Sequence, residues 1–253
     1  MTNILSIKNL TKKYHTPKNE TLAIKDISLD IKKGEIIGIV GSSGCGKSTL
    51  LNILAGLDKQ TSGEIIKSNL KDAYMLQSDA LLPWLNVLDN ACLGLKLKNI
   101  KNDDNVNYVK KLIKNFGLES FMYSYPNNLS GGMKQRVALI RTLAIKPDII
   151  YLDEPLSALD YVTRLTITDE IHSILKKMKV TTILISHDIA ECVSFCDRIV
   201  VLSKRPAIVK NIYDIKLSNP NKPSINRKDE LFNYYYDLVW KDLDKWALNI
   251  KNT

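Results

Sequence analysis

A short apolar run, a glycine-rich loop and a helical stretch follow one another directly near the start of the chain. The run is Ile36 to Val40, the loop is Gly41-Ser42-Ser43-Gly44-Cys45-Gly46-Lys47-Ser48, and apolar residues at helical spacing come next. The loop has the pattern G-x-x-x-x-G-K-[ST], whose glycines let backbone amides curl around phosphate oxygens at the positive end of a helix. The sequence therefore predicts a strand, a phosphate-binding loop and a helix in that order.

The residues of this loop have expected tasks. We expect a bound nucleotide to be held by Gly41, Ser42, Ser43, Gly44, Cys45, Gly46, Lys47, Ser48 and Thr49. Lys47 is expected to reach the β and γ phosphates of ATP, and the Ser48 hydroxyl to bind Mg²⁺. Because Cys45 lies among the phosphate-binding amides, we expect alkylation of its thiol to inhibit the protein and bound ATP to protect the thiol.

Three further apolar runs predict more strands of the same sheet. They are Ile149 to Leu152, Thr181 to Ile185 and Ile199 to Leu202, and helical patterns separate most of the runs. Continuous apolar runs are typical of parallel strands that are covered on both faces. We therefore expect an α/β fold, in which a phosphate-loop core of mainly parallel sheet has flanking helices. The alternating residues at the start of the chain add an N-terminal antiparallel β part.

We expect one domain over residues 1–253 with three parts. Residues 1–79 and 142–206 are predicted to form the catalytic core. Residues 80–141 are predicted to form an inserted helical subdomain, since apolar residues recur at helical spacing between Val106 and Phe116. Residues 207–253 form a C-terminal extension, in which the Asn-, Pro- and Ser-rich stretch 218–227 predicts a loop and the following residues an amphipathic helix.

The composition of the chain limits its expected partners and cellular location. The formal charge is +9, but the lysines are scattered in ones and twos, which is typical of a solvated surface rather than a dedicated groove. The four cysteines form no C-x-x-C pair, so we expect reduced thiols in a cytoplasmic protein. The sequence contains no stretch of about 18 uncharged apolar residues, the length that would predict a transmembrane helix. Any membrane role would then require a partner.

Two carboxylates follow one of the predicted strands. The run Ile149-Ile150-Tyr151-Leu152 leads into Asp153 and Glu154. Asp153 is placed to bind Mg²⁺, and Glu154 to orient and polarise an attacking water molecule. Acidic residues after strands are common, so the pair alone is weak evidence for a metal and water site. Together with the phosphate loop earlier in the chain it is strong evidence.

A third motif points to a family. Leu129-Ser130-Gly131-Gly132-Met133-Lys134-Gln135-Arg136 resembles the signature sequence of ATP-binding-cassette (ABC) ATPases. Ser130, Gly131 and Gly132 would open a helix and provide a second anion site from backbone amides and the helix dipole. The resemblance implies that two protomers, most simply two copies of this chain, pack head to tail. Each ATP would then contact one protomer's phosphate loop and the other protomer's signature helix.

The same resemblance implies roles for four more positions. Gln77 resembles the glutamine that senses Mg²⁺ and the attacking water, and His187 the histidine that hydrogen-bonds the γ phosphate. Ser157-Ala158-Leu159-Asp160 resembles the loop that crosses the dimer interface, so that Asp160 lies near nucleotide. Tyr14 is placed like the aromatic residue that stacks on adenine. An exposed aromatic near a strand end is an almost equally good interpretation of Tyr14.

Within the family, the chain most resembles the nitrate, sulfonate and taurine importer group. The matching stretches are 81–90, the signature with Met133, 163–165 and 202–206. The resemblance implies an ATPase at the cytoplasmic face of the membrane that drives an integral membrane permease, while an extracytoplasmic solute-binding protein acts indirectly. Thiamine-precursor importers belong to the same group, so the solute stays open. The alternative is a soluble ATPase of this family that acts on ribosomes or DNA, but we expect no nucleic-acid partner.

Overall fold

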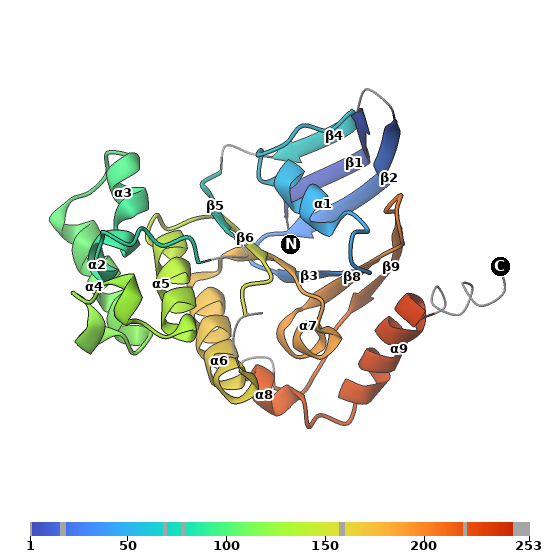
Figure 1. Ribbon diagram of the computed structural model, residues 1–253. Helices are drawn as coiled ribbons and strands as arrows, with labels where there is room; N and C mark the ends of the chain where they lie inside the picture. The colour runs from blue at the N-terminus through green and yellow to red at the C-terminus, as the bar shows by residue number, and fades with distance from the viewer. Residues whose placement is uncertain are drawn as a thin grey trace.

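The computed structural model describes residues 2–15, 19–67, 70–76, 79–156, 160–219 and 222–244. The fold contains two sheets, with helix α1 (Lys47–Leu54) against the smaller one and the other helices around the larger one (Figure 1). The strands are β1 Asn3–His15, β2 Glu20–Lys32, β3 Ile36–Val40, β4 Ser62–Lys67, β5 Asp72–Met75, β6 Ile149–Asp153, β7 Thr181–Ile185, β8 Arg198–Leu202 and β9 Val209–Asp214. The helices are α1 Lys47–Leu54, α2 Val87–Ala91, α3 Leu93–Leu97, α4 Asp103–Asn115, α5 Gly131–Leu143, α6 Tyr161–Met178, α7 Ile189–Phe195, α8 Pro223–Asn226 and α9 Phe232–Asp244, with short 3-10 turns at Glu119–Phe121 and Pro126–Asn128.

The larger sheet has six strands in the order β5-β6-β7-β3-β8-β9. The first five are parallel, and β9 pairs antiparallel with β8 at the edge. All four apolar runs of the sequence lie in its central strands β3, β6, β7 and β8, and every residue of these strands is buried. The predicted fold, with a mainly parallel sheet covered on both faces, is confirmed.

The smaller sheet is the expected N-terminal antiparallel part, with the order β2-β1-β4. Helix α1 packs between this sheet and the larger one, where Leu50, Leu51 and Leu54 share a buried cluster with residues of both sheets. The loop after β8 joins the two sheets, because the Ala207 amide donates to the Ala23 carbonyl at 2.9 Å. This arrangement holds β2 beside the phosphate-loop helix (Figure 1).

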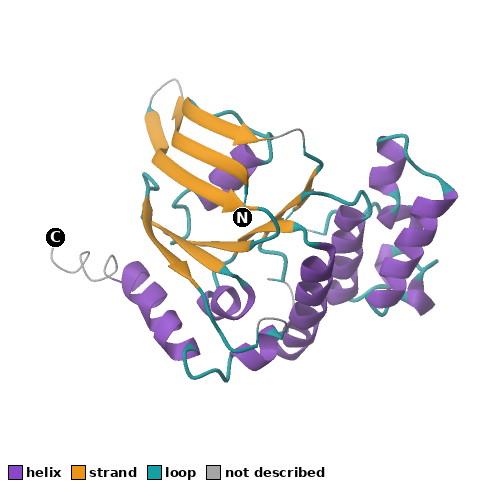
Figure 2. Cartoon of the chain, turned by 180° about the vertical axis from the view of Figure 1, so that it is seen from behind, coloured by secondary structure: helices purple, strands orange, loops and turns teal. Residues whose placement is uncertain are grey.

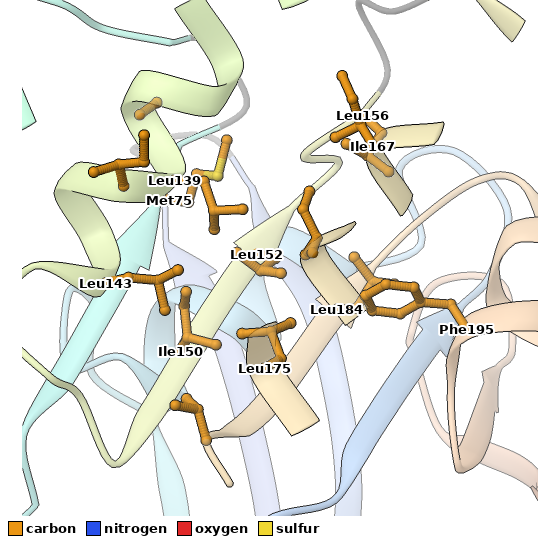
Figure 3. Close-up of a cluster of buried hydrophobic side chains, with 14 of the residues drawn as sticks. Met75, Leu139, Leu143, Ile150, Leu152, Leu156, Ile167, Leu175, Leu184 and Phe195 are labelled. Carbon is orange, nitrogen blue, oxygen red and sulfur yellow. The ribbon is translucent and has the colours of Figure 1, made fainter. Parts of the chain in front are cut away.

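The other face of the large sheet carries helices α5, α6 and α7. Alternate residues of β6 face opposite sides of the sheet. Ile149 and Tyr151 pack toward α1, while Ile150 and Leu152 pack toward α5 and α6. Figure 3 shows this second cluster, with Ile150 and Leu152 among side chains from several helices and from β7. Both faces of the strand are thus fixed by apolar contacts, which leaves the strand ends to carry chemistry.

Helices α2 to α5 lie together at one end of the large sheet, at the left of Figure 1 and the right of Figure 2. The predicted helical spacing is seen in α4, whose Val109, Leu112 and Ile113 are buried. Among the described residues, no helix has the length and apolarity needed to span a membrane. The boundaries of the three parts at residues 80, 142 and 207 stay predictions.

The C-terminal region differs from expectation in one place. The stretch 218–227 was predicted as a loop, but residues 223–226 form the short helix α8. Pro223 supplies the fixed φ that favours a first helical position, and the Ser224 amide donates to Asp169 Oδ1 of α6 at 2.8 Å. A contact with a distant helix therefore overrides the local composition.

Candidate functional site

Four connections meet at the carboxyl edge of the large sheet. The phosphate loop follows β3, Glu154 follows β6, His187 follows β7 and Arg205 follows β8. They border one open pocket of ≈ 690 Å³. Its lining residues are Tyr14, Ala23, Ser43, Gly44, Gly46, Lys47, Ser48, Thr49, Glu154, His187 and Arg205. Parallel strands end at the same edge, so residues far apart in sequence come together here.

The backbone of the loop depends on glycine at two points. Gly44 and Gly46 have φ values of 70° and 124°, in the region that favours residues without a side chain. A Cβ atom on Gly46 would also lie 3.1 Å from the Ala23 carbonyl oxygen. Because α1 begins at Lys47 with no side-chain cap, its first amide groups are free to bind an anion.

The side chain of Lys47 is held across the loop. Its Nζ donates to the carbonyl oxygens of Gly41 and Ser42 at 2.8 and 3.0 Å, and the residue is only 8% exposed. The ammonium group is thus placed where the amides of the loop and the start of α1 converge. This combination of one fixed cation and several donors suits a polyphosphate.

The Cys45 thiol does not face the pocket. The residue is 2% exposed and belongs to the apolar cluster around α1. A Cβ atom on Gly41 would lie 2.7 Å from the Cys45 sulfur, which places the thiol beneath the loop. This burial argues against the expected alkylation of Cys45 with protection by ATP, and leaves the backbone of Cys45 available to a ligand in the pocket.

Asp153 lies at the end of β6 and accepts hydrogen bonds from two hydroxyl groups. The Ser48 hydroxyl is one donor and the Tyr74 hydroxyl, 3.4 Å away, is the other. Burial raises the pKa of Asp153, because the charged form loses hydration. A cation beside it would offset this cost. Hydroxyl and carboxylate oxygens are the hard ligands that Mg²⁺ takes, with phosphates and water completing its shell.

No group of three or more His, Cys, Asp and Glu side chains that could hold a metal ion occurs in the described part of the chain. Ser48 and Asp153 nevertheless fit Mg²⁺, since a nucleotide-bound magnesium ion needs only one or two protein ligands. Their metal-binding role stays a prediction. Gln77, the third predicted ligand, lies outside the described residues.

Glu154 and His187 are in direct contact. Nδ1 of His187 lies 3.2 Å from Oε1 of Glu154. The Glu154 backbone has φ 49°, a strained value for a residue with a side chain, and its amide donates to the Ile185 carbonyl at 3.0 Å. These contacts fix a carboxylate and an imidazole on the wall of the pocket. The pair can orient a water molecule and exchange a proton with it.

The signature residues lie elsewhere in this chain. Ser130 is the N-cap of α5, and its Oγ accepts from the Met133 amide at 3.3 Å, as expected for a motif that opens a helix. Ser130 and Gly131 are exposed, and neither they nor Gly132 line the pocket. The predicted contact of this helix with nucleotide requires a second protomer and stays a prediction.

Asp160 is likewise exposed and lies outside the pocket lining. It is the N-cap of α6, and its Oδ1 accepts from the Thr163 amide at 3.0 Å. Hydrogen bonds from Thr163 hold the pKa of Asp160 below its usual value. The other residues of that motif, Ser157, Ala158 and Leu159, lie outside the described residues.

The Tyr14 ring borders the pocket and is 40% exposed. Its hydroxyl donates to Oδ2 of Asp58 at 2.9 Å. Sequence reasoning gave no role to Asp58, which is 44 residues away along the chain. Arg205 was also missed as a pocket residue, although its segment was noted for its resemblance to importer ATPases. Its guanidinium adds a second positive charge, besides Lys47, to the pocket wall.

A phosphate loop, two carboxylates and a histidine beyond the ends of parallel strands define a nucleotide-binding protein of the phosphate-loop class. The profile of the ABC transporter family matches residues 24–157, more than half of the chain. The chain belongs to this family of ATP-binding, ATP-hydrolysing proteins. The family prediction from the signature sequence is confirmed.

Curated relatives match most of this chain. An uncharacterized ABC transporter ATP-binding protein of Bacillus subtilis is 37% identical, with 98% of each chain covered. The aliphatic sulfonates import ATP-binding protein of Bacillus cereus, from the predicted group, is 35% identical over 90% of this chain and 92% of its own. The spermidine/putrescine import ATP-binding protein of Mesoplasma florum is 41% identical over 80% of this chain and 59% of its own.

Solved structures share the fold. The ATP-binding cassette MJ0796, in a dimeric post-hydrolysis state bound to ADP and phosphate, matches with a TM-score of 0.74 and 33% sequence identity. The match covers 84% of this chain and 99% of that one.

Proposed function

We propose that this chain is the ATP-hydrolysing subunit of an importer and drives uptake of a small solute through a membrane permease. The observation that carries the proposal is that Lys47 of the phosphate loop and the contacting pair Glu154 and His187 line the same pocket. Such a pocket provides a phosphate site and a water-activating carboxylate together. The importer relatives support the coupling of this chemistry to transport.

Each predicted residue has a defined part in hydrolysis. The loop amides and Lys47 bind the phosphates of ATP and balance their charge. Ser48 and Asp153 hold the Mg²⁺ ion, which supplies positive charge to the phosphate oxygens when it is bound. Glu154 orients the attacking water and accepts its proton, while His187 keeps the carboxylate in place and donates to the γ phosphate.

The second nucleotide site comes from a second protomer. Ser130 and the start of α5 are exposed and separate from the pocket, which suits a surface that meets ATP bound to a partner. The helix N-terminus supplies amide donors and a positive dipole end for the γ phosphate. Asp160 lies at the same dimer interface in this proposal. Closure of the dimer on ATP then moves helices α2 to α5, which act on the permease.

The location and the partners of the protein follow from this role. The protein is peripheral at the cytoplasmic face of the membrane, and the permease and an external binding protein select the solute. The sulfonate relative supports a small organic anion, whereas the spermidine/putrescine relative is named for cations, so we assign no solute. No comparison favours action on ribosomes or DNA.

Native co-purification tests the transport role. The tagged protein is solubilised from membranes in mild detergent, and its companions are identified by mass spectrometry. A polytopic permease that is recovered with the wild type and with Glu154→Gln, which keeps the fold, supports the proposal. Ribosomal or DNA-repair proteins without a permease would leave an ATPase whose work lies away from the membrane.

A further inference from the structure

The Tyr14 ring is held from two sides by the same acidic residue and its partner. Asp58 Oδ2 accepts from the Tyr14 hydroxyl at 2.9 Å, and Asp58 Oδ1 accepts from Lys12 Nζ at 2.6 Å. Lys12 Nζ in turn lies 4.7 Å from the centroid of the Tyr14 ring. The three side chains form a closed set, which we call the Tyr14 clamp.

Within the clamp, hydrogen bonds and burial hold the Lys12 ammonium in place. Its ammonium also donates to the Lys59 carbonyl at 2.6 Å, and the residue is only 9% exposed. The hydrogen bond from Lys12 is the largest cause that keeps the pKa of Asp58 below its usual value, so the carboxylate stays charged. A buried ammonium needs such partners, because its hydration is lost. The cation against the ring adds its own attraction.

Of the three residues of the clamp, Tyr14 lines the pocket, whereas Lys12 and Asp58 do not. Lys12 thus contacts the ring without itself bordering the pocket. Tyr14 is 40% exposed, so part of its side chain stays open to a flat ligand beside the phosphate loop.

Asp58 also ties the ring to the helix that carries the phosphate site. The amides of Leu57 and Asp58 donate to the Asn52 carbonyl at 2.8 and 3.3 Å, directly after α1. Helix α1 begins at Lys47 of the phosphate loop. A second tie joins the same turn to β1, since the Thr61 amide donates to the Thr11 carbonyl at 2.8 Å. The ring and the phosphate loop are thus linked through one short, rigid path.

We propose that Lys12 and Asp58 are positioning residues that hold the Tyr14 ring ready to stack on the base of a nucleotide whose phosphates occupy the loop. The inference rests on the proposed nucleotide function and adds two residues that select for the base. A ring fixed before binding loses less side-chain entropy on stacking, so affinity for the base rises. Neither residue touches the phosphates, so their effect is confined to ligands that carry a base.

The test compares ADP with pyrophosphate, which lacks the base, by titration calorimetry on the full chain with Mg²⁺. The variants are Lys12→Met and Asp58→Asn, and Lys12→Arg keeps a cation near the ring. Lys13 is a matched control, because it is the next residue of β1 and its ammonium pairs with Glu20 at 2.8 Å instead of contacting Tyr14. Lys13→Met therefore removes the same charge from the same strand.

The proposal expects Lys12→Met and Asp58→Asn to bind ADP up to about tenfold more weakly, the size of the entropy cost when one side chain must be immobilised on binding. Pyrophosphate affinity stays unchanged, and Lys12→Arg and Lys13→Met bind ADP like the wild type. Equal losses for both ligands would show that the clamp only supports the fold, and unchanged ADP affinity would remove its role.

Tyr14→Ala separates this inference from the function beneath it. If Tyr14→Ala weakens ADP binding but the Lys12 and Asp58 variants do not, the clamp is overturned and stacking stands. If Tyr14→Ala leaves ADP binding unchanged while pyrophosphate still binds, the base does not stack on Tyr14 and the clamp fails with it. A wild type that binds neither ligand would overturn the proposed nucleotide function itself.

Discussion

Glu154 Oε1 and His187 Nδ1 lie 3.2 Å apart on the wall of the pocket that the phosphate loop borders. The two residues follow adjacent parallel strands, β6 and β7, whose register pairs Asp153 with Ile185. Their contact is thus a consequence of strand pairing in the buried sheet. In the proposed mechanism Glu154 accepts a proton and His187 contacts phosphate, which makes the pair the most informative target for mutation.

Glu154→Gln is expected to lower the rate of ATP hydrolysis by about 100-fold or more, the usual loss when a general base is removed. The amide keeps the shape of the side chain but cannot accept the proton, so ATP binding remains. Trapped ATP should then hold two protomers together. Phosphate release and size-exclusion chromatography with ATP measure the two effects.

Glu119→Gln is the matched control for that variant, since Glu119 pairs with Lys114 on the exposed surface of the helical region. It should hydrolyse ATP like the wild type. A Glu154→Gln protein that stays monomeric at saturating ATP, or hydrolyses at the wild-type rate, contradicts the assigned role.

Lys47→Ala is expected to weaken ATP binding by at least about tenfold, because charge-assisted contacts to the phosphates are lost. Titration calorimetry measures the affinity. Lys33→Ala removes an exposed charge near the other end of β3 and should bind normally. Since Lys47 also donates to Gly41 and Ser42, circular dichroism must show that the variant is folded. Undiminished affinity in a folded variant would count against the phosphate loop.

Much of this site is predictable because its determinants are local. The strand, loop and helix between residues 36 and 54 are fixed by a continuous apolar run, by glycines at positive φ and by an apolar helix face. The acidic pair after β6 is found in the same way, from a buried strand that ends in carboxylates. That both meet at one edge follows from parallel pairing alone.

Other features depend on contacts that no local pattern reveals. The Asp58 carboxylate reaches Tyr14 across 44 residues of sequence, and Asp169 fixes the short helix α8 from 55 residues away. The direction of a side chain in an irregular loop is equally hidden, as the buried Cys45 thiol shows. These positions are set by tertiary packing, which composition and spacing do not encode.

The thiols are expected to react slowly and without regard to ATP. All four cysteines are free and buried, and Cys45 packs beneath the loop rather than in the pocket. A disulfide reagent such as Ellman's reagent should titrate them only as the protein opens, and all of them in denaturant. Cys45→Ala should show the same slow native reaction. Rapid labelling of Cys45 that ATP prevents would contradict this and show that reagents reach the thiol from the pocket.

Acid is expected to destabilise the protein through His172. The residue is 3% exposed, and burial, followed by the charge of Lys176, lowers its pKa from 6.5 to about 4 despite the nearby carboxylates of Asp197 and Asp169. Between these values the unfolded chain binds a proton that the folded protein does not, so stability is lost as pH falls through 6.5 toward 4. The loss attributable to this one group is about 3 kcal/mol.

His172→Phe removes the group while keeping a ring against Phe195, whose ring centroid lies 5.2 Å from that of His172. Urea unfolding at pH 7 and at pH 4 should therefore show a smaller acid loss for the variant than for the wild type, by about 3 kcal/mol. His15→Gln changes an exposed histidine, 67% exposed at the side chain, and should follow the wild type. Parallel pH profiles for His172→Phe and the wild type would mean that His172 takes up its proton in the folded protein without cost.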